Sequence, residues 1–229
     1  MLDLEQFTSS NMKSFISFLF SMCLISAHAE RLVLNVGDIV EICGHKAIVF
    51  SLDDTGEHGK AMYVGALRGV DSPWCCSRKH ASKLPHVTDC ENGEKNTKAI
   101  KFYAETNNAW SSFPVFNWCH NLGDNWYVPS LKELEGFINF WLGNEDIFNW
   151  DEESEYEVGS DRPFFKDINQ KLIEAGGIPF INGVYTSTVD ADGKVFVFYY
   201  NRRKNTWSLK RRANTSLGQD CVGRAFINF

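Results

Sequence analysis

The chain has 229 residues, of which 44% are hydrophobic and 23% are charged; these ordinary values exclude a disordered chain and a coiled coil. Its formal net charge of −6 argues against a general nucleic-acid binder, because such binding depends on neutralising phosphates. Aromatic residues are abundant, at 14%, and predict either a stiff core or exposed stacking surfaces.

The first 29 residues have the layout of a secretory signal. Lys13 supplies the positive start, an apolar run covers residues 15–25, and Ala27-His28-Ala29 resembles a cleavage site. The run is too short to span a bilayer, which needs about 20 apolar residues. We therefore expect residues 1–29 to be a signal peptide, with Met12 as the true start. The alternatives are a buried N-terminal helix and a lipid anchor at Cys23.

Loss of this segment would leave six of the seven cysteines. An even number in an exported protein favours disulfide bonds over metal ligation. The most metal-like cluster combines cysteines with His80 and His86, but its spacing is irregular for tetrahedral zinc, so we expect no metal. Reactive thiols are the further alternative. Four of the six lie in the N-terminal part of the exported chain: Cys43, Cys75, Cys76 and Cys90. Four cysteines can form three sets of disulfides, and two of these sets avoid a bond between the adjacent Cys75 and Cys76.

The N-terminal part of the exported chain is predicted to be β-structure. Residues 33–67 contain short β-rich runs, with a hairpin turn at Cys43-Gly44, a buried strand near 47–52 and a further strand over 60–67. Residues 68–96 have no clear period. A stretch of that length inside a compact domain indicates a functional loop or a loop held by disulfides.

Three helices are predicted next. The first covers residues 97–122 and is broken near Pro114. The second begins at Ser130-Leu131-Lys132-Glu133, a capping box in which the two polar side chains bond each other's backbone, and ends at Gly143. The third covers residues 162–175.

The remainder is predicted to be β again, with strands over 184–188, 194–200, 206–211 and 221–229. The final strand is expected to pair with the sheet of its own domain. Strands at both ends of the chain and helices between them predict an α+β fold.

Two charged segments are candidate binding surfaces. The loop over residues 146–157 holds six acids together with Trp150 and Tyr156. Oxygen-rich loops suit calcium, and aromatic rings beside carboxylates suit a sugar; the alternative is a solvated loop whose Trp150 packs on the core. The basic runs Arg202-Arg203-Lys204 and Lys210-Arg211-Arg212 could bind an anionic polymer, but we favour a solvated edge that discourages strand pairing.

Catalysis is not expected from the motifs. Paired carboxylates can hydrolyse glycosides, but no pair stands out among the acids of the 146–157 loop. The sequence contains neither a G-x-S-x-G nucleophile motif nor a phosphate-binding P-loop. We therefore expect a protein that is not an enzyme.

Several segments of the chain resemble the motifs of one known family. Residues 117–137, NWCHNLGDNWYVPSLKELEGF, resemble a "C…LG…W-R/Y-L-P-S/T…E-L" segment. Residues 168–180 and 184–188 resemble a helix followed by Gly-Gly and "YWSST", and residues 220–229, DCVGRAFINF, resemble a closing "VRAV…F" strand. Residues 47–64 look like a hairpin that often precedes the domain. Together these segments resemble the secreted bacterial C-type-lectin-like domains, a family of unassigned function.

The resemblance implies a twisted antiparallel sheet flanked by two to three helices, with an N-terminal β-hairpin extension. Residues 30–96 would form the hairpin region and cysteine-rich loop, and residues 97–229 the C-type-lectin-like domain, packed together as one unit. The family also implies a disulfide between the first helix and the last strand, positions held here by Cys119 and Cys221. The Glu-Pro-Asn and Trp-Asn-Asp triplets of sugar-binding members are absent, so calcium-dependent sugar binding is not implied.

We expect an exported, non-catalytic domain, located in the periplasm, on the cell surface or outside the cell, without a membrane span after signal removal. Its partner would be an extracellular glycan, surface polymer or protein, and no obligate cofactor is expected, calcium being the alternative. By analogy with the long-loop face of lectins, the candidate ligand-binding residues are Trp150, Tyr156 and Arg202. The other hypotheses are an assembly or accessory subunit of a surface structure and an enzyme similar to those that generate formylglycine.

Overall fold

The computed structural model describes nine stretches of the chain: residues 33–68, 73–84, 87–141, 143, 155–157, 163–180, 182–201, 206–213 and 221–229. The expected signal peptide and lipid-anchor alternative lie outside them. Residues Leu34–Phe229 form one compact unit. Among the described helices, none has the length and apolar character needed to cross a bilayer.

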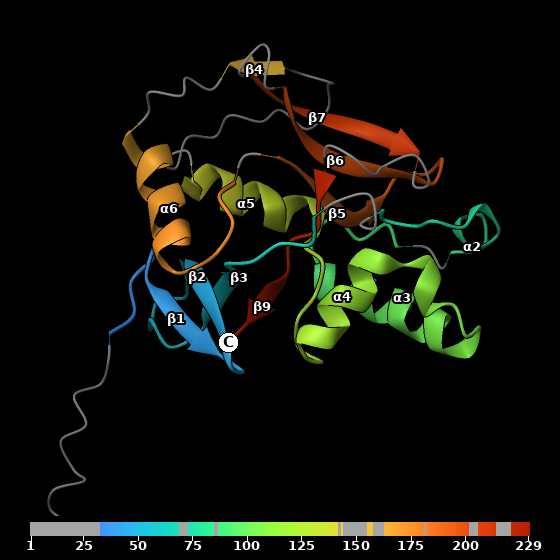
Figure 1. Cartoon of the computed structure of the whole chain (residues 1–229), viewed down its shortest axis with the longest axis horizontal. Helices are drawn as coiled ribbons and strands as arrows, with labels where there is room; N and C mark the ends of the chain where they lie inside the picture. The colour runs from blue at the N-terminus through green and yellow to red at the C-terminus, as the bar shows by residue number, and fades with distance from the viewer. Residues whose placement is uncertain are drawn as a thin grey trace, which may run out of the picture. The chain divides into compact units, whose positions relative to one another are not determined.

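The α+β prediction is confirmed: the unit contains two sheets, with helices packed against both (Figure 1). The four-stranded sheet is antiparallel throughout and has the order β1-β2-β3-β9. Its strands are β1 Ile39–Ile42, β2 His45–Leu52, β3 Gly59–Tyr63 and β9 Phe226–Asn228.

The five-stranded sheet has the order β4-β7-β6-β5-β8 and is antiparallel except for the pairing of β5 with β8. Its strands are β4 Glu155–Glu157, β5 Gly183–Val189, β6 Lys194–Asn201, β7 Thr206–Ala213 and β8 Cys221–Val222.

The helices follow the predicted order, with differences at their ends. They are α2 Arg78–Ala81, α3 Gly93–Thr106, α4 Pro114–Leu122, α5 Leu131–Trp141 and α6 Pro163–Glu174. The helix expected over residues 97–122 is two helices separated by the 3-10 turn Trp110–Ser112. Pro114 occupies the first turn of α4, where its missing N–H costs nothing.

The N-terminal strands share a sheet with the last strand of the chain. Strand β9 pairs with β3 in the register Lys60↔Asn228, Ala61↔Ile227 and Met62↔Phe226. The apolar side chains of this pairing are buried, and without β9 the edge of β3 would lose its cover. The first and last strands of the compact unit therefore belong to one sheet, and Figure 1 shows β9 beside β3.

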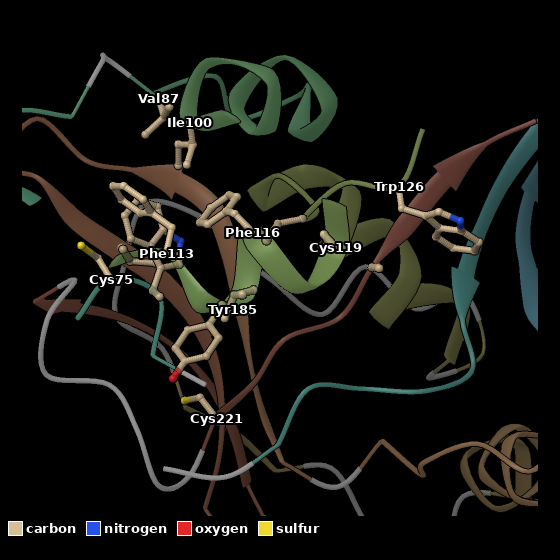
Figure 2. Close-up of a cluster of buried hydrophobic side chains, with 14 of the residues drawn as sticks. Cys75, Val87, Ile100, Phe113, Phe116, Cys119, Trp126, Tyr185 and Cys221 are labelled. Atoms are coloured by element: carbon tan, nitrogen blue, oxygen red, sulfur yellow. The ribbon is translucent and has the colours of Figure 1, made fainter. Parts of the chain in front are cut away.

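The core consists of two hydrophobic clusters. One lies under α3 and α4 and includes Phe113, Phe116 and Tyr185 (Figure 2). The other surrounds Phe137 on α5, which contacts both β2 and β5. Helix α5 therefore contacts both sheets.

The cysteine-rich loop is anchored by an aromatic side chain. Trp74 is fully buried, and its indole N–H donates a hydrogen bond of 2.8 Å to the carbonyl of Thr186 on β5. No disulfide joins two of the described cysteines in the structure. The bond expected between Cys119 and Cys221 stays a prediction. Both residues are buried, and Figure 2 shows them at separate places in the cluster.

Alkylation should separate the cysteines by burial. Cys43 and Cys76 are exposed, whereas Cys75 and Cys119 are buried, and desolvation raises the pKa of both buried thiols. Because only the thiolate reacts, we expect iodoacetamide to modify Cys43 and Cys76 in the native protein and Cys75 and Cys119 only after denaturation. Peptide mass mapping measures this. A cysteine that resists alkylation in denaturant until a reductant is added would instead belong to a disulfide.

Candidate functional site

The structure places only one of the three predicted ligand-binding residues. Tyr156 lies on β4 and pairs in register with Trp207 on β7, whereas Trp150 and Arg202 lie outside the described residues. The pairing of β4 with β7 places the end of the acidic loop, residues 155–157, beside residues 206–208 of the C-terminal hairpin. Whether that face binds a ligand stays a prediction.

A groove elsewhere has the features of a binding site. It lies between the four-stranded sheet and helix α5 and has a volume of about 390 Å³. Strands β2 and β3, the segment before α3 and helix α5 all contribute side chains to it. The lining residues are Phe50, Ser51, Lys60, Glu91, Lys132, Glu133, Gly136 and Phe140.

Glu133 organises the polar end of the groove. Its side chain is buried, and its carboxylate accepts four hydrogen bonds. Oε1 accepts from the ammonium of Lys60 and from the hydroxyl of Tyr127 (3.0 Å), and Oε2 accepts from the N–H groups of Gly93 and Ser130 (both 2.9 Å). Every lone pair of the carboxylate therefore has a donor.

The same arrangement fixes the state of Tyr127. Burial is the main cause that raises the pKa of this hydroxyl far above its usual value, and the Glu133 carboxylate raises it further. The hydroxyl therefore stays protonated at every physiological pH. It donates to Glu133 or to Asn228 Oδ1, which also lies 3.0 Å away.

The rim carries balanced charge. Lys132 on α5 forms an ion pair of 3.0 Å with Glu91, and both side chains are at least half exposed. The side chain of Lys60 is one-third exposed, so its ammonium retains donors for a ligand after bonding Glu133. Two lysines and two glutamates leave the groove with no net charge, which favours a neutral polar ligand over an ionic one.

The floor is apolar and rigid. Phe50 packs edge to face against Phe137, with ring centroids 5.4 Å apart, and contacts Phe226 at 4.8 Å. Phe140 contacts Phe137 at 6.1 Å. These contacts hold the two rings that line the groove in place, and aromatic pairs of this kind add to the stability of a core.

Gly136 keeps the floor open. It lies inside α5, where glycine costs about 0.5–1 kcal/mol relative to alanine. A Cβ added at this position would have no atom within 4 Å, so packing does not require a glycine here. The effect of having no side chain at Gly136 is that bare helix backbone lies beside Phe140 at the base of the groove.

This geometry suits binding better than proton transfer. Lys60 and Glu133 are adjacent titratable groups, but a general base needs a lone pair aimed at the substrate, and all those of Glu133 face donors. Within the described stretches, no group of three or more His, Cys, Asp and Glu side chains could hold a metal ion. His86 and most of the acidic loop lie outside these stretches.

Sequence reasoning identified only Glu133 among these residues, and only as a helix cap. Lys60, Phe50 and Phe140 come from segments whose meeting depends on the tertiary fold. The one local signal is Gly136, a helix-disfavouring residue in the middle of an otherwise regular amphipathic pattern.

Comparisons with known proteins add one distant likeness. No family model matches the chain, and no curated protein matches it. Among solved structures, the chain is similar to a fimbrial protein from Bacteroides ovatus, with 17% sequence identity and a TM-score of 0.44. The match covers 75% of this chain and 36% of that protein, so the chain spans about a third of its length.

Proposed function

We propose that this chain is an exported, non-catalytic domain of the C-type-lectin-like class that binds an extracellular glycan in the groove between β2, β3 and α5. The observation that carries the proposal is the composition of the groove: an aromatic floor, opened by Gly136, beside a charge-balanced polar end. A sugar ring has an apolar face for such a floor and hydroxyls for such polar groups.

The lectin-like part of the proposal is supported by the order of the motifs and by the layout of the chain. Helices α3, α4, α5 and α6 precede strands β5 to β9, and β9 pairs with β3 of the N-terminal sheet. Calcium has no role in the proposed binding, because the groove supplies ammonium and hydroxyl donors where calcium would need several oxygen ligands.

Filling the groove at Gly136 tests the proposal. Gly136→Phe should reduce glycan binding at least tenfold, because the new ring occupies the floor. Gly136→Ala is the matched control: it adds only a Cβ in open space and should retain binding while stabilising the protein by about 0.5–1 kcal/mol. Binding is measured on a glycan array with and without EDTA, and stability by thermal unfolding.

The outcomes distinguish the functional classes. Binding that survives EDTA and is lost only in Gly136→Phe would support the proposal. Equal binding by both variants would show that the ligand lies elsewhere. Binding to no glycan would contradict the proposal and favour an assembly or accessory subunit with a protein partner.

A further inference from the structure

The C-terminal hairpin has an unusual distribution of charge. From Gly193 to Gln219 the sequence contains seven lysines and arginines and no acid, although the chain as a whole has a net charge of −6. Strands β6 and β7 make up most of this segment. Positive charge is therefore concentrated on one hairpin of an acidic protein.

Two of these cations share one aromatic ring. Lys210 and Arg212 alternate along β7, opposite Val197 and Val195 of β6, so they lie on the same face of the sheet. Lys210 Nζ lies 4.6 Å from the centroid of the Tyr199 ring, and Arg212 Cζ lies 5.9 Å from it. Cation–π contacts of this kind hold both charged groups in place.

Lys210 and Arg212 differ from most described lysines in having no carboxylate partner among the described residues. No carboxylate of the described residues forms an ion pair with Lys210 or Arg212, and Arg212 is exposed. Two like charges held over one ring repel each other, and a bound anion would relieve that repulsion. In contrast, seven other described lysines pair with carboxylates: Lys60, Lys95, Lys98, Lys101, Lys132, Lys171 and Lys194.

We propose that Lys210 and Arg212, positioned by Tyr199, bind an acidic polysaccharide at a surface separate from the groove. Residues two apart on a strand are about 7 Å apart, which suits a polymer with one carboxylate or sulfate per sugar or two. Duplex DNA carries one charge per 1.7 Å of axis, a spacing much denser than the spacing of these two cations.

A pair of double variants with equal charge change tests this surface. Polygalacturonate is the probe, and heparin and duplex DNA are run in parallel. Lys210→Gln with Arg212→Gln should weaken polygalacturonate binding at least tenfold and make its salt dependence shallower by about two charges. Lys79→Gln with Lys83→Gln removes two exposed lysines of another region and should change binding less than threefold. Thermal unfolding verifies that both variants are folded.

Each remaining outcome decides the question. Equal losses in the two double variants would show that net charge alone attracts the polymer, and absence of binding to any polyanion would show that the cations only protect a strand edge; either result overturns the proposal. Tighter binding to DNA would overturn the choice of polysaccharide. Gly136→Phe should bind polygalacturonate normally, so failure of the groove proposal would leave this one intact.

Discussion

Arg224→Met is expected to destabilise the protein by at least about 3 kcal/mol. Arg224 precedes β9 and is almost fully buried, at 1% exposure. One guanidinium nitrogen donates to the carbonyls of Val64 and Gly65 at 3.4 and 3.2 Å. The other donates to those of Ile178 and Pro179 at 2.9 and 3.0 Å.

This cation ties together three parts of the chain that are distant in sequence. Desolvation lowers the pKa of Arg224 to about 9, which still leaves the group charged at neutral pH. The four carbonyls and the Phe180 ring, 5.4 Å from the guanidinium carbon, offset the cost of burying the charge. Methionine would fill a similar volume but would leave carbonyls without donors, each costing about 1–3 kcal/mol when buried.

Urea unfolding of Arg224→Met and Arg224→Lys measures the effect. Lysine keeps the charge over Phe180 but cannot reach both pairs of carbonyls. The free energy of unfolding of Arg224→Lys should therefore lie between that of Arg224→Met and that of the parent protein. A loss below about 1 kcal/mol for Arg224→Met, with an unchanged urea m-value, would show that water replaces the guanidinium without cost.

Glu133→Ala is expected to cost about 2–6 kcal/mol, because two buried N–H groups lose their acceptor at about 1–3 kcal/mol each. The change leaves the buried N–H groups of Gly93 and Ser130 without their acceptor and Lys60 without its anion. It also separates the starts of α3 and α5, which approach so closely that a Cβ on Gly93 would lie 2.5 Å from the Ser130 nitrogen.

Glu133→Gln is the matched control, because it keeps the shape of the side chain. Its amide NH₂ would face donors on either side, and only the Tyr127 hydroxyl can turn to accept. Glu133→Gln should therefore lower the free energy of unfolding, but by less than Glu133→Ala does. Thermal and urea unfolding compare the stability of both variants with that of the parent protein. An alanine variant as stable as the glutamine variant would contradict the role assigned to the carboxylate.

Local pattern predicted a large part of the fold. The Ser130–Glu133 capping box marks the start of α5, and its reciprocal bonds are present at 2.9 and 3.3 Å. The same glutamate also bonds Gly93 and Lys60, which lie 40 and 73 positions away. No spacing rule encodes those distances, because they result from packing α5 against α3 and β3.

The candidate groove could not be predicted for the same reason. The sequence favoured Trp150, Tyr156 and Arg202 because aromatic and charged residues gather in their loops. Phe50 and Phe140, by contrast, read as ordinary core positions of a strand and a helix. They line a groove because the tertiary fold brings β2 and α5 together at this place.

The pairing of β9 with β3 has a consequence for when the N-terminal sheet can fold during synthesis. Its partners are separated by most of the chain, and the Arg224 contact to Val64 alone spans 160 positions. Closing so long a loop is slow and entropically costly. Residues 226–228 must be synthesised before the N-terminal sheet can be completed. Until then, the edge of β3 that pairs with β9 has no partner strand.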